Sequence, residues 1–234
     1  MCGRYVSPDQ AAIERVWHLG RQNSNPFVRR FNVQPTSIVP TLRVDPESGE
    51  LELVTARWGL VPHWWEDAKP PQSCFNARIE EAAAKPMWRD AMRRTRCLIP
   101  AEGWYEWQPR VRPGSAKPYK QPYFIHRRDA APLAFAGLMS VSRSADGGEP
   151  LLSCAILTAS SAGKLAQVHS RMPVVLPVEL QAAWLDPALN DGAKAAELCQ
   201  STAATQELEH YPVSTVVNNG ASDGETLIEK IDLE

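Results

Sequence analysis

The chain begins Met1-Cys2-Gly3, and Cys2 has the most distinctive chemistry in the sequence. An aminopeptidase removes Met1 when the next side chain is small, which would leave Cys2 with a free α-amine beside its thiol. An α-amine has an ordinary pKa of about 8, so part of it is neutral and nucleophilic near pH 7. Such an amine condenses with an aldehyde to an imine, and the thiolate then closes a thiazolidine ring. Alternatively, the amine is the internal base for the thiol, as in N-terminal-nucleophile hydrolases, or Cys2 is simply a small unprocessed residue.

Aromatic residues surround a second chemically interesting side chain, Glu106. At the two-residue period of a strand, Trp104 and Glu106 share one face, and Tyr105 and Trp107 share the other. A carboxyl group that is desolvated by bulky neighbours has a raised pKa, which suits general acid–base catalysis. Glu102 has the same parity and competes for this role. A glutamate exposed at a strand edge is the simpler interpretation.

Further polar candidates lie in two other segments. Asn76 and Arg78 are two positions apart, so on a strand they point the same way, and an amide beside a guanidinium can hold phosphate or sugar oxygens. His169 precedes an apolar stretch and can transfer protons near neutral pH. A turn asparagine, a surface arginine and a core histidine are the structural alternatives. Trp64 and Trp65 suggest one core ring and one ring that stacks on a base.

These side chains have to be positioned by a domain of moderate size. The chain has 234 residues, of which 44% are hydrophobic, and 20 prolines that suit many short elements. Its apolar periodicity predicts one α+β domain over 1–234, with a curved, barrel-like mixed or antiparallel β-sheet core flanked by short helices. Helices are expected over 9–19, 87–95, 178–184 and 192–199. Strands are expected over 37–43, 50–58, 96–100, 123–126, 133–139, 151–159 and 213–217. We expect a basic hairpin or loop over 110–120 and a flexible acidic tail over 221–234.

Composition excludes several classes of protein. No apolar run approaches the ~18 residues of a membrane helix, and no signal peptide is evident, so we expect a cytoplasmic protein. Five cysteines without a C-x-x-C pair argue against disulfides and a standard zinc site. No phosphate-binding loop, serine-hydrolase elbow or metal-ligand cluster is found, so we expect no metal and no other cofactor. Basic residues exceed acidic ones up to about residue 130, which favours a local surface for nucleic acid.

Five motifs occur in a fixed order along the chain: MCGRY at 1–5, WGLVP at 58–62, NARIE at 76–80, GWYEW at 103–107 and HSRMP at 169–173. Together they resemble the SRAP family, the SOS-response-associated peptidases or abasic site processing proteins. The resemblance extends from Cys2 to about Gly220. Each motif alone is weak, whereas the ordered set is specific.

The resemblance implies a DNA-repair enzyme that senses abasic sites in single-stranded DNA and crosslinks to them. Cys2 would be the nucleophile after loss of Met1, and Asn76 would position the opened sugar and the amine. Glu106 would be the acid–base group for ring opening and for reversing the link, and His169 would assist proton transfer. The implied DNA-binding residues are Arg4, Arg78 and Arg171 for phosphates, Trp65 and Trp107 for stacking or as wedges, and Thr158 in the pocket wall.

The expected partner is therefore single-stranded DNA containing an abasic site, with no membrane and no metal. The enzyme would carry lyase-type Schiff-base chemistry and an autoproteolytic cysteine peptidase activity that removes Met1, and it would associate with the nucleoid when bound to DNA. One alternative is an N-terminal cysteine peptidase or amidohydrolase that does not act on DNA. Another is a single-strand-binding module without chemistry.

Overall fold

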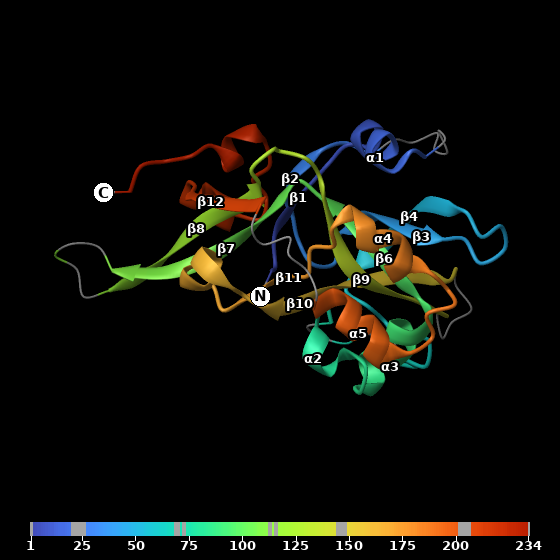
Figure 1. Ribbon diagram of the computed structural model, residues 1–234. Coiled ribbons are helices and arrows are strands. Elements are labelled where there is room, and N and C mark those ends of the chain that lie inside the picture. The colour runs from blue at the N-terminus through green and yellow to red at the C-terminus, as the bar shows by residue number, and fades with distance from the viewer. Residues whose placement is uncertain are drawn as a thin grey trace.

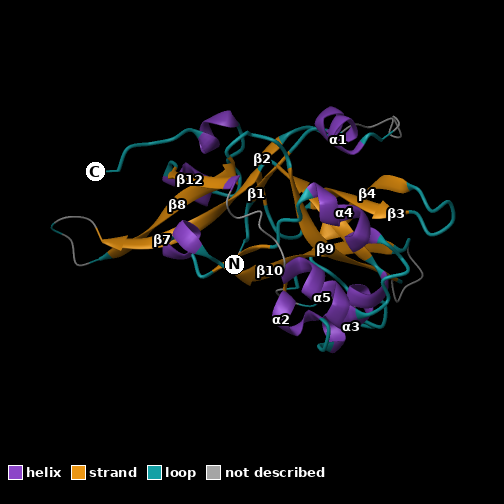
Figure 2. Ribbon diagram, viewed as in Figure 1, coloured by secondary structure: helices purple, strands orange, loops and turns teal. Residues whose placement is uncertain are grey.

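The computed structural model describes residues 2–19, 27–67, 71, 74–111, 114, 117–143, 149–200 and 207–233. Two β-sheets form the centre of the molecule, and short helices flank them (Figures 1 and 2). The hairpin of β7 (Gly103–Val111) and β8 (Pro118–Arg127) projects at one end, while α2 (Ile79–Ala82), α3 (Pro86–Arg94) and α5 (Gly192–Gln200) gather at the other. None of the helices among these residues is long and apolar enough to cross a membrane.

The first sheet is antiparallel and carries the N-terminal strand in its interior. Its order is β12-β8-β7-β1-β2, where β12 is Leu208–Pro212, β1 is Tyr5–Ser7 and β2 is Arg30–Val33. Tyr5 pairs with Trp104 on one side and with Val33 on the other. This pairing fixes the chain immediately after Cys2 against the strand that carries Glu106. The hairpin predicted over 110–120 is the β7–β8 connection, part of which lies outside the described residues.

The second sheet closes on itself. Its order is β11-β10-β4-β3-β6-β9, with β11 at Arg171–Pro173, β10 at Leu151–Ser160, β4 at Leu51–Trp58, β3 at Ile38–Val44, β6 at Arg96–Ala101 and β9 at Leu133–Ser142. Because β10 also pairs with β9, the five strands from β10 to β9 form a barrel. The short strand β5 (Asn76–Arg78) runs parallel to β10 and joins it beyond the end of β4. The predicted α+β class with a barrel-like mixed sheet is confirmed.

Alternation along the barrel strands divides the core into two parts. On β6, Leu98 packs in the cluster that includes the helices α1 (Gln10–Trp17), α3, α4 (Val178–Leu185) and α5. Cys97 and Ile99 pack instead with the aromatic residues of the first sheet. There the Tyr5 ring contacts Trp58 edge-on at 5.3 Å between centroids. Such aromatic contacts hold the N-terminal strand against the barrel.

Among the helices and strands expected from the sequence, one has a different structure. The strand predicted over 213–217 is wrong, because Thr215–Asn218 forms a 3₁₀ helix. The side chain of Ser214 accepts a hydrogen bond from the backbone N–H of Val216, which starts the helical turn and competes with a sheet.

The acidic tail, for which the sequence predicts flexibility, is attached to the body at several points. Glu225–Ile228 forms a 3₁₀ helix, and Leu227 within it is buried. The hydroxyl of Tyr211 donates to the carbonyl of Ile228 at 2.9 Å. Val213 and Lys230 form an isolated β-bridge. The segment thus packs against the first sheet through apolar and polar contacts.

Candidate functional site

Cys2 lies at the junction of the two sheets, directly before β1. Its side chain is 0% exposed, and its Sγ lies 3.8 Å from the carbonyl oxygen of Arg4. Burial, and next the charge of Glu106, raise the pKa of the Cys2 thiol well above its ordinary value. The thiol is therefore protonated at neutral pH, and any reaction as a thiolate requires a base nearby.

Asn76 is the side chain that holds the Cys2 backbone. It lies on β5, opposite Ile156 of β10, and its Nδ2 donates to the carbonyl oxygen of Cys2 at 2.6 Å. The other amide atom, Oδ1, is buried and has no hydrogen-bond partner within the described part of the chain. A donor close to Cys2, such as an α-amine freed there, is the kind of group that this oxygen can accept from.

Glu106 is the buried acid of the site. It lies on β7 with Trp104 on the same face, and it is 3% exposed. Desolvation raises its pKa to about 7, so near neutral pH the carboxyl group can either donate or accept a proton. The competing candidate, Glu102, is bound instead by the guanidinium of Arg29, with nitrogen–oxygen distances of 2.9 and 2.5 Å.

His169 faces Glu106 from the turn before β11. Its Nδ1 lies 3.8 Å from Oε2 of Glu106 and 3.0 Å from the backbone nitrogen of Arg171. The same Nδ1 also lies 3.0 Å from the carbonyl oxygen of Arg171, so whether it accepts or donates there follows the tautomer of the ring. Desolvation lowers the pKa of His169, so the imidazole is neutral at neutral pH. Glu106 and His169 thus bring a proton donor and a proton acceptor next to each other.

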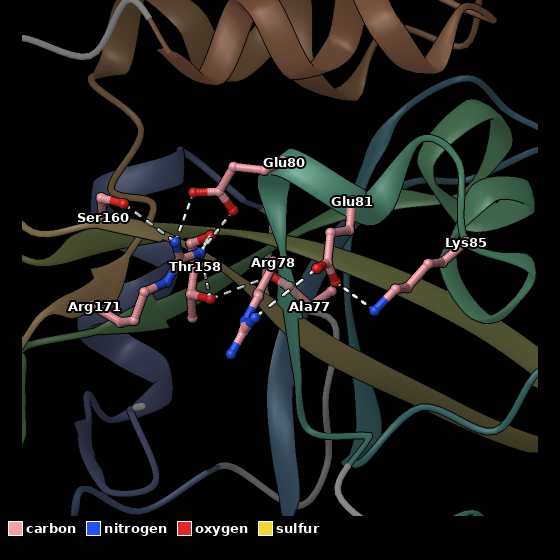
Figure 3. Close-up of polar contacts among 8 residues, drawn as sticks. All are labelled: Ala77, Arg78, Glu80, Glu81, Lys85, Thr158, Ser160 and Arg171. Atoms are coloured by element: carbon pink, nitrogen blue, oxygen red, sulfur yellow. Dashed lines mark hydrogen bonds and ion pairs between the residues drawn. The ribbon is translucent and has the colours of Figure 1, made fainter.

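The guanidinium group of Arg171 is hydrogen-bonded to other residues of the protein (Figure 3). Its Nη1 and Nη2 bind the two oxygens of Glu80 at 2.6 and 2.9 Å, and Nη2 also donates to the carbonyl oxygen of Thr158 at 2.5 Å. Thr158 is fully buried, and its hydroxyl donates to the carbonyl of Ala77 at 3.4 Å. A phosphate would therefore share Arg171 with Glu80. Arg78 is more exposed and lies 3.9 Å from Glu81.

A cavity of about 390 Å³ opens beside Glu106 and His169, lined also by Arg4, Trp107, Lys120 and Asn218. Arg4 donates to Oδ1 of Asn32 at 2.9 Å and to the carbonyl of Val217 at 2.8 Å. The indole of Trp107 donates to Oδ1 of Asn218 at 2.7 Å. The 3₁₀ helix Thr215–Asn218 thus completes the cavity wall through Asn218.

Two lining residues were missed by the sequence analysis. Lys120 lies in the basic segment over 110–120, and that charge was the available signal. No sequence pattern indicates Asn218, because its hydrogen-bond partner Trp107 is 111 residues away in the chain. Trp65 is not among the residues that line the cavity; its ring centroid lies 6.0 Å from that of Trp64, which is 43% exposed.

A second large cavity lies away from this chemistry. A cavity of about 500 Å³ is lined by Trp17, Leu133, Pro177 and their neighbours, and it includes none of the predicted site residues. Within the described ranges, no group of three or more His, Cys, Asp or Glu side chains is arranged to hold a metal ion.

The fold and the site define an α+β protein whose second residue is a buried cysteine, held by an amide and influenced by a carboxyl group that faces an imidazole. The family model for the SOS response associated peptidase (SRAP) matches residues 1–220, and the chain belongs to this family.

Named relatives extend over most of the chain. The abasic site processing protein YoqW of Bacillus subtilis is 34% identical over 199 residues, 85% of each chain. YedK of Escherichia coli, also named an abasic site processing protein, is 32% identical over 206 residues, 87% of this chain and 86% of its own. A phage-related protein from Bordetella bronchiseptica superposes with a TM-score of 0.68 at 33% identity, covering 91% of this chain and 94% of its own.

Proposed function

We propose that this chain processes abasic sites in single-stranded DNA, and that Cys2, after removal of Met1, traps the sugar aldehyde as a thiazolidine crosslink. The observation that carries the proposal is the convergence of four segments on one point. Asn76 Nδ2 lies 2.6 Å from the Cys2 carbonyl, the charge of Glu106 acts on the Cys2 thiol, and His169 lies 3.8 Å from Glu106. The relatives that are named abasic site processing proteins support the substrate.

The proposed chemistry uses both protonation states of Glu106. An abasic deoxyribose is mostly a closed hemiacetal, and a carboxyl group with a pKa of about 7 can protonate the ring oxygen to release the aldehyde. The Cys2 amine then attacks C1′, and a water molecule leaves to give the imine. Addition of the Cys2 sulfur to the same carbon closes the ring, and the thiol proton passes to the imine nitrogen. Neutral His169 accepts and returns protons during these steps.

The cavity wall supports DNA as the substrate. Arg4 and Lys120 contribute positive charge, and Trp107 contributes an aromatic ring. Cations that bind phosphates, together with a ring that stacks on bases, recognise a single strand without reading its sequence. Exposed Arg78 adds a further cation beside Asn76. In this proposal the protein acts in the cytoplasm and associates with the nucleoid through its substrate.

A second activity of the same site is removal of Met1 by the Cys2 thiol, as the peptidase name of the family suggests. The thiol is protonated because burial raises its pKa, so Glu106 would have to act as its base. A peptidase that acts on other peptides, the alternative reading of the sequence, has no evident use for the cationic and aromatic cavity wall.

The test is intact-mass spectrometry of the untagged protein before and after incubation with a single-stranded oligonucleotide that carries one abasic site. We expect a starting mass without Met1 and then a stable adduct. Cys2→Ala should form no adduct, whereas Cys154→Ala, which alters another fully buried cysteine, should form one. An oligonucleotide with a ring analogue that cannot open to an aldehyde should bind without reacting. A processed chain that forms no adduct would exclude the mechanism, and turnover of a peptide substrate would favour the hydrolase.

A further inference from the structure

A small void lies beside Glu106 and His169, separate from the open cavity. Its volume is about 10 Å³, and its wall includes Trp104, Glu106, Ser161, His169 and Arg171, with the apolar residues Ile125, Leu165, Val168 and Met172. This volume matches the space that a single water molecule requires. An apolar void of this size would stay dry, so the polar lining decides what it holds.

Three residues that line the void each have a polar side-chain atom without a hydrogen-bond partner within the described part of the chain. These atoms are Nε1 of Trp104, Oγ of Ser161 and Nε of Arg171, and each of them is buried. Trp104 is 1% exposed, so its indole N–H cannot reach bulk water. Buried donors and acceptors that stay unpaired are costly, and native proteins satisfy almost all of them.

These donors and acceptors match the hydrogen-bonding capacity of a single water molecule. A water molecule accepts two hydrogen bonds and donates two. The residues of the wall carry two N–H donors, on Trp104 and Arg171, and two oxygen acceptors, on Ser161 and Glu106. We propose that this void binds one water molecule and that Trp104, Ser161 and Arg171 hold it against the carboxyl group of Glu106.

This site gives the water a role in the chemistry proposed above, on which the role rests. To reverse the crosslink, the C1′–S bond of the thiazolidine breaks and the sulfur takes the proton of the Glu106 carboxyl group, which leaves an iminium ion and a carboxylate. The water oxygen then bonds to C1′, and one of its protons passes to the Glu106 carboxylate. The C1′–N bond breaks as Glu106 returns that proton to the amine, and the hydroxyl proton on the C1′ oxygen passes to the Glu106 carboxylate as the C=O bond forms. The aldehyde and the free Cys2 are regenerated, with the water consumed.

The position of the void fits that role. Trp104 and Glu106 lie on the same face of β7, and the backbone nitrogen of Arg171 lies 3.0 Å from Nδ1 of His169. The water would therefore lie between the groups that hold the acid and the base. Ser161 is tied to the same turn, since its backbone N–H donates to the carbonyl of Ser170 at 3.0 Å. Ser161 is thus a positioning residue that acts through the water.

The first experiment is a crystal structure of the untagged protein at a resolution that shows single waters, about 1.5 Å. We expect a density peak within hydrogen-bonding distance of Trp104 Nε1, Ser161 Oγ and Arg171 Nε. A second structure, of Ser161→Val, should lack the peak because the larger side chain fills the void. An empty void in the first structure would overturn the proposal.

The second experiment measures formation and reversal of the crosslink separately. Ser161→Ala should slow reversal about tenfold, the effect of losing one hydrogen bond to the attacking water. Formation, which consumes no water, should change less. Trp104→Phe removes the indole donor and should act in the same direction. Ser170→Ala, an exposed serine of the same turn, is the matched control and should reverse at the wild-type rate.

The two proposals fail in different ways. If the wild-type protein forms no crosslink, the proposed function is wrong, while the density peak still decides the water site. If the peak is present and Ser161→Ala reverses as fast as the wild type, the water is structural and the hydrolytic role is refuted.

Discussion

The Oε2 atom of Glu106 and the Nδ1 atom of His169 lie 3.8 Å apart, beyond direct hydrogen-bonding distance. Desolvation moves both groups toward the uncharged form: it raises the pKa of Glu106 to about 7 and lowers the pKa of His169. Near neutral pH the site therefore holds a neutral imidazole beside a carboxyl group that is close to half protonated. This pair can give and take protons without a large energetic penalty.

The raised pKa of Glu106 should appear in the pH dependence of stability. The unfolded carboxyl group has its ordinary pKa of 4.5, whereas the folded one titrates at about 7. Between these values the folded state holds more protons than the unfolded state, so stability falls as pH rises. We expect the wild type to lose up to about 3 kcal/mol relative to Glu106→Gln between about pH 4 and about pH 8. Urea unfolding of both proteins at the two pH values measures this difference, and parallel curves would contradict it.

The same group should shape the pH profile of crosslink formation. The Cys2 amine must be neutral, which favours pH above about 8, and Glu106 must be protonated, which favours pH below about 7. The single-turnover rate should therefore pass through a maximum between these values. Glu106→Gln should lower the maximum by about a hundredfold or more, because general acid–base catalysis typically contributes that factor. If the pH–rate profile of Glu106→Gln kept the shape and height of the wild-type profile, another group would be the general acid.

Asn76 should matter for chemistry rather than for DNA affinity. Its Nδ2 holds the Cys2 carbonyl at 2.6 Å, so Asn76→Ala frees the nucleophile from its fixed position. We expect crosslink formation to slow about a hundredfold, a magnitude typical of lost positioning. Binding to undamaged single strands should stay within about twofold, since the amide contributes no charge.

Asn190→Ala, which alters an exposed amide outside the cavity wall, is the matched control and should react at the wild-type rate. Single-turnover gels measure the reaction, and fluorescence anisotropy measures the binding. If Asn76→Ala weakened binding as much as reaction, the amide would be a DNA contact instead.

Local patterns were enough to predict much of this molecule. Alternating and continuous apolar runs predicted the barrel strands β9 and β10, because their side-chain periodicity is a property of adjacent residues. The aromatic neighbours of Glu106 predicted its burial for the same reason. The 3₁₀ helix at Thr215–Asn218 was mistaken for a strand because Val213, Val216 and Val217 have high strand propensity, while the turn depends on the Ser214 side chain.

Contacts between distant segments could not be predicted in this way. Glu80 and Arg171 are 91 residues apart, and Glu80 looks in sequence like an ordinary surface acid. The two meet because β5 and β11 both pair with β10, a fact of sheet topology. The assignment of Arg171 to phosphate binding therefore left out its carboxylate partner.

Glu80 should limit the affinity of the site for DNA. Its carboxylate binds both terminal nitrogens of Arg171 at 2.6 and 2.9 Å, and it competes with any phosphate for them (Figure 3). Removing the competing charge in Glu80→Gln leaves Arg171 held by Thr158 and Ser160 and free to attract phosphate. The carboxylate is 45% exposed, so the effect is moderate, and we expect binding to single strands about threefold tighter.

The salt dependence separates this role from a structural one. One additional phosphate contact should steepen the slope of log K against log salt by about 0.7 for a single strand. Anisotropy titrations in a Cys2→Ala background, which prevents crosslinking, measure both quantities. Glu52→Gln removes a carboxylate that pairs with Arg43 on the β3–β4 hairpin, and it should change neither. If Glu80→Gln instead bound DNA more weakly with an unchanged slope, the carboxylate would serve to hold Arg171 in its binding orientation rather than to oppose phosphate.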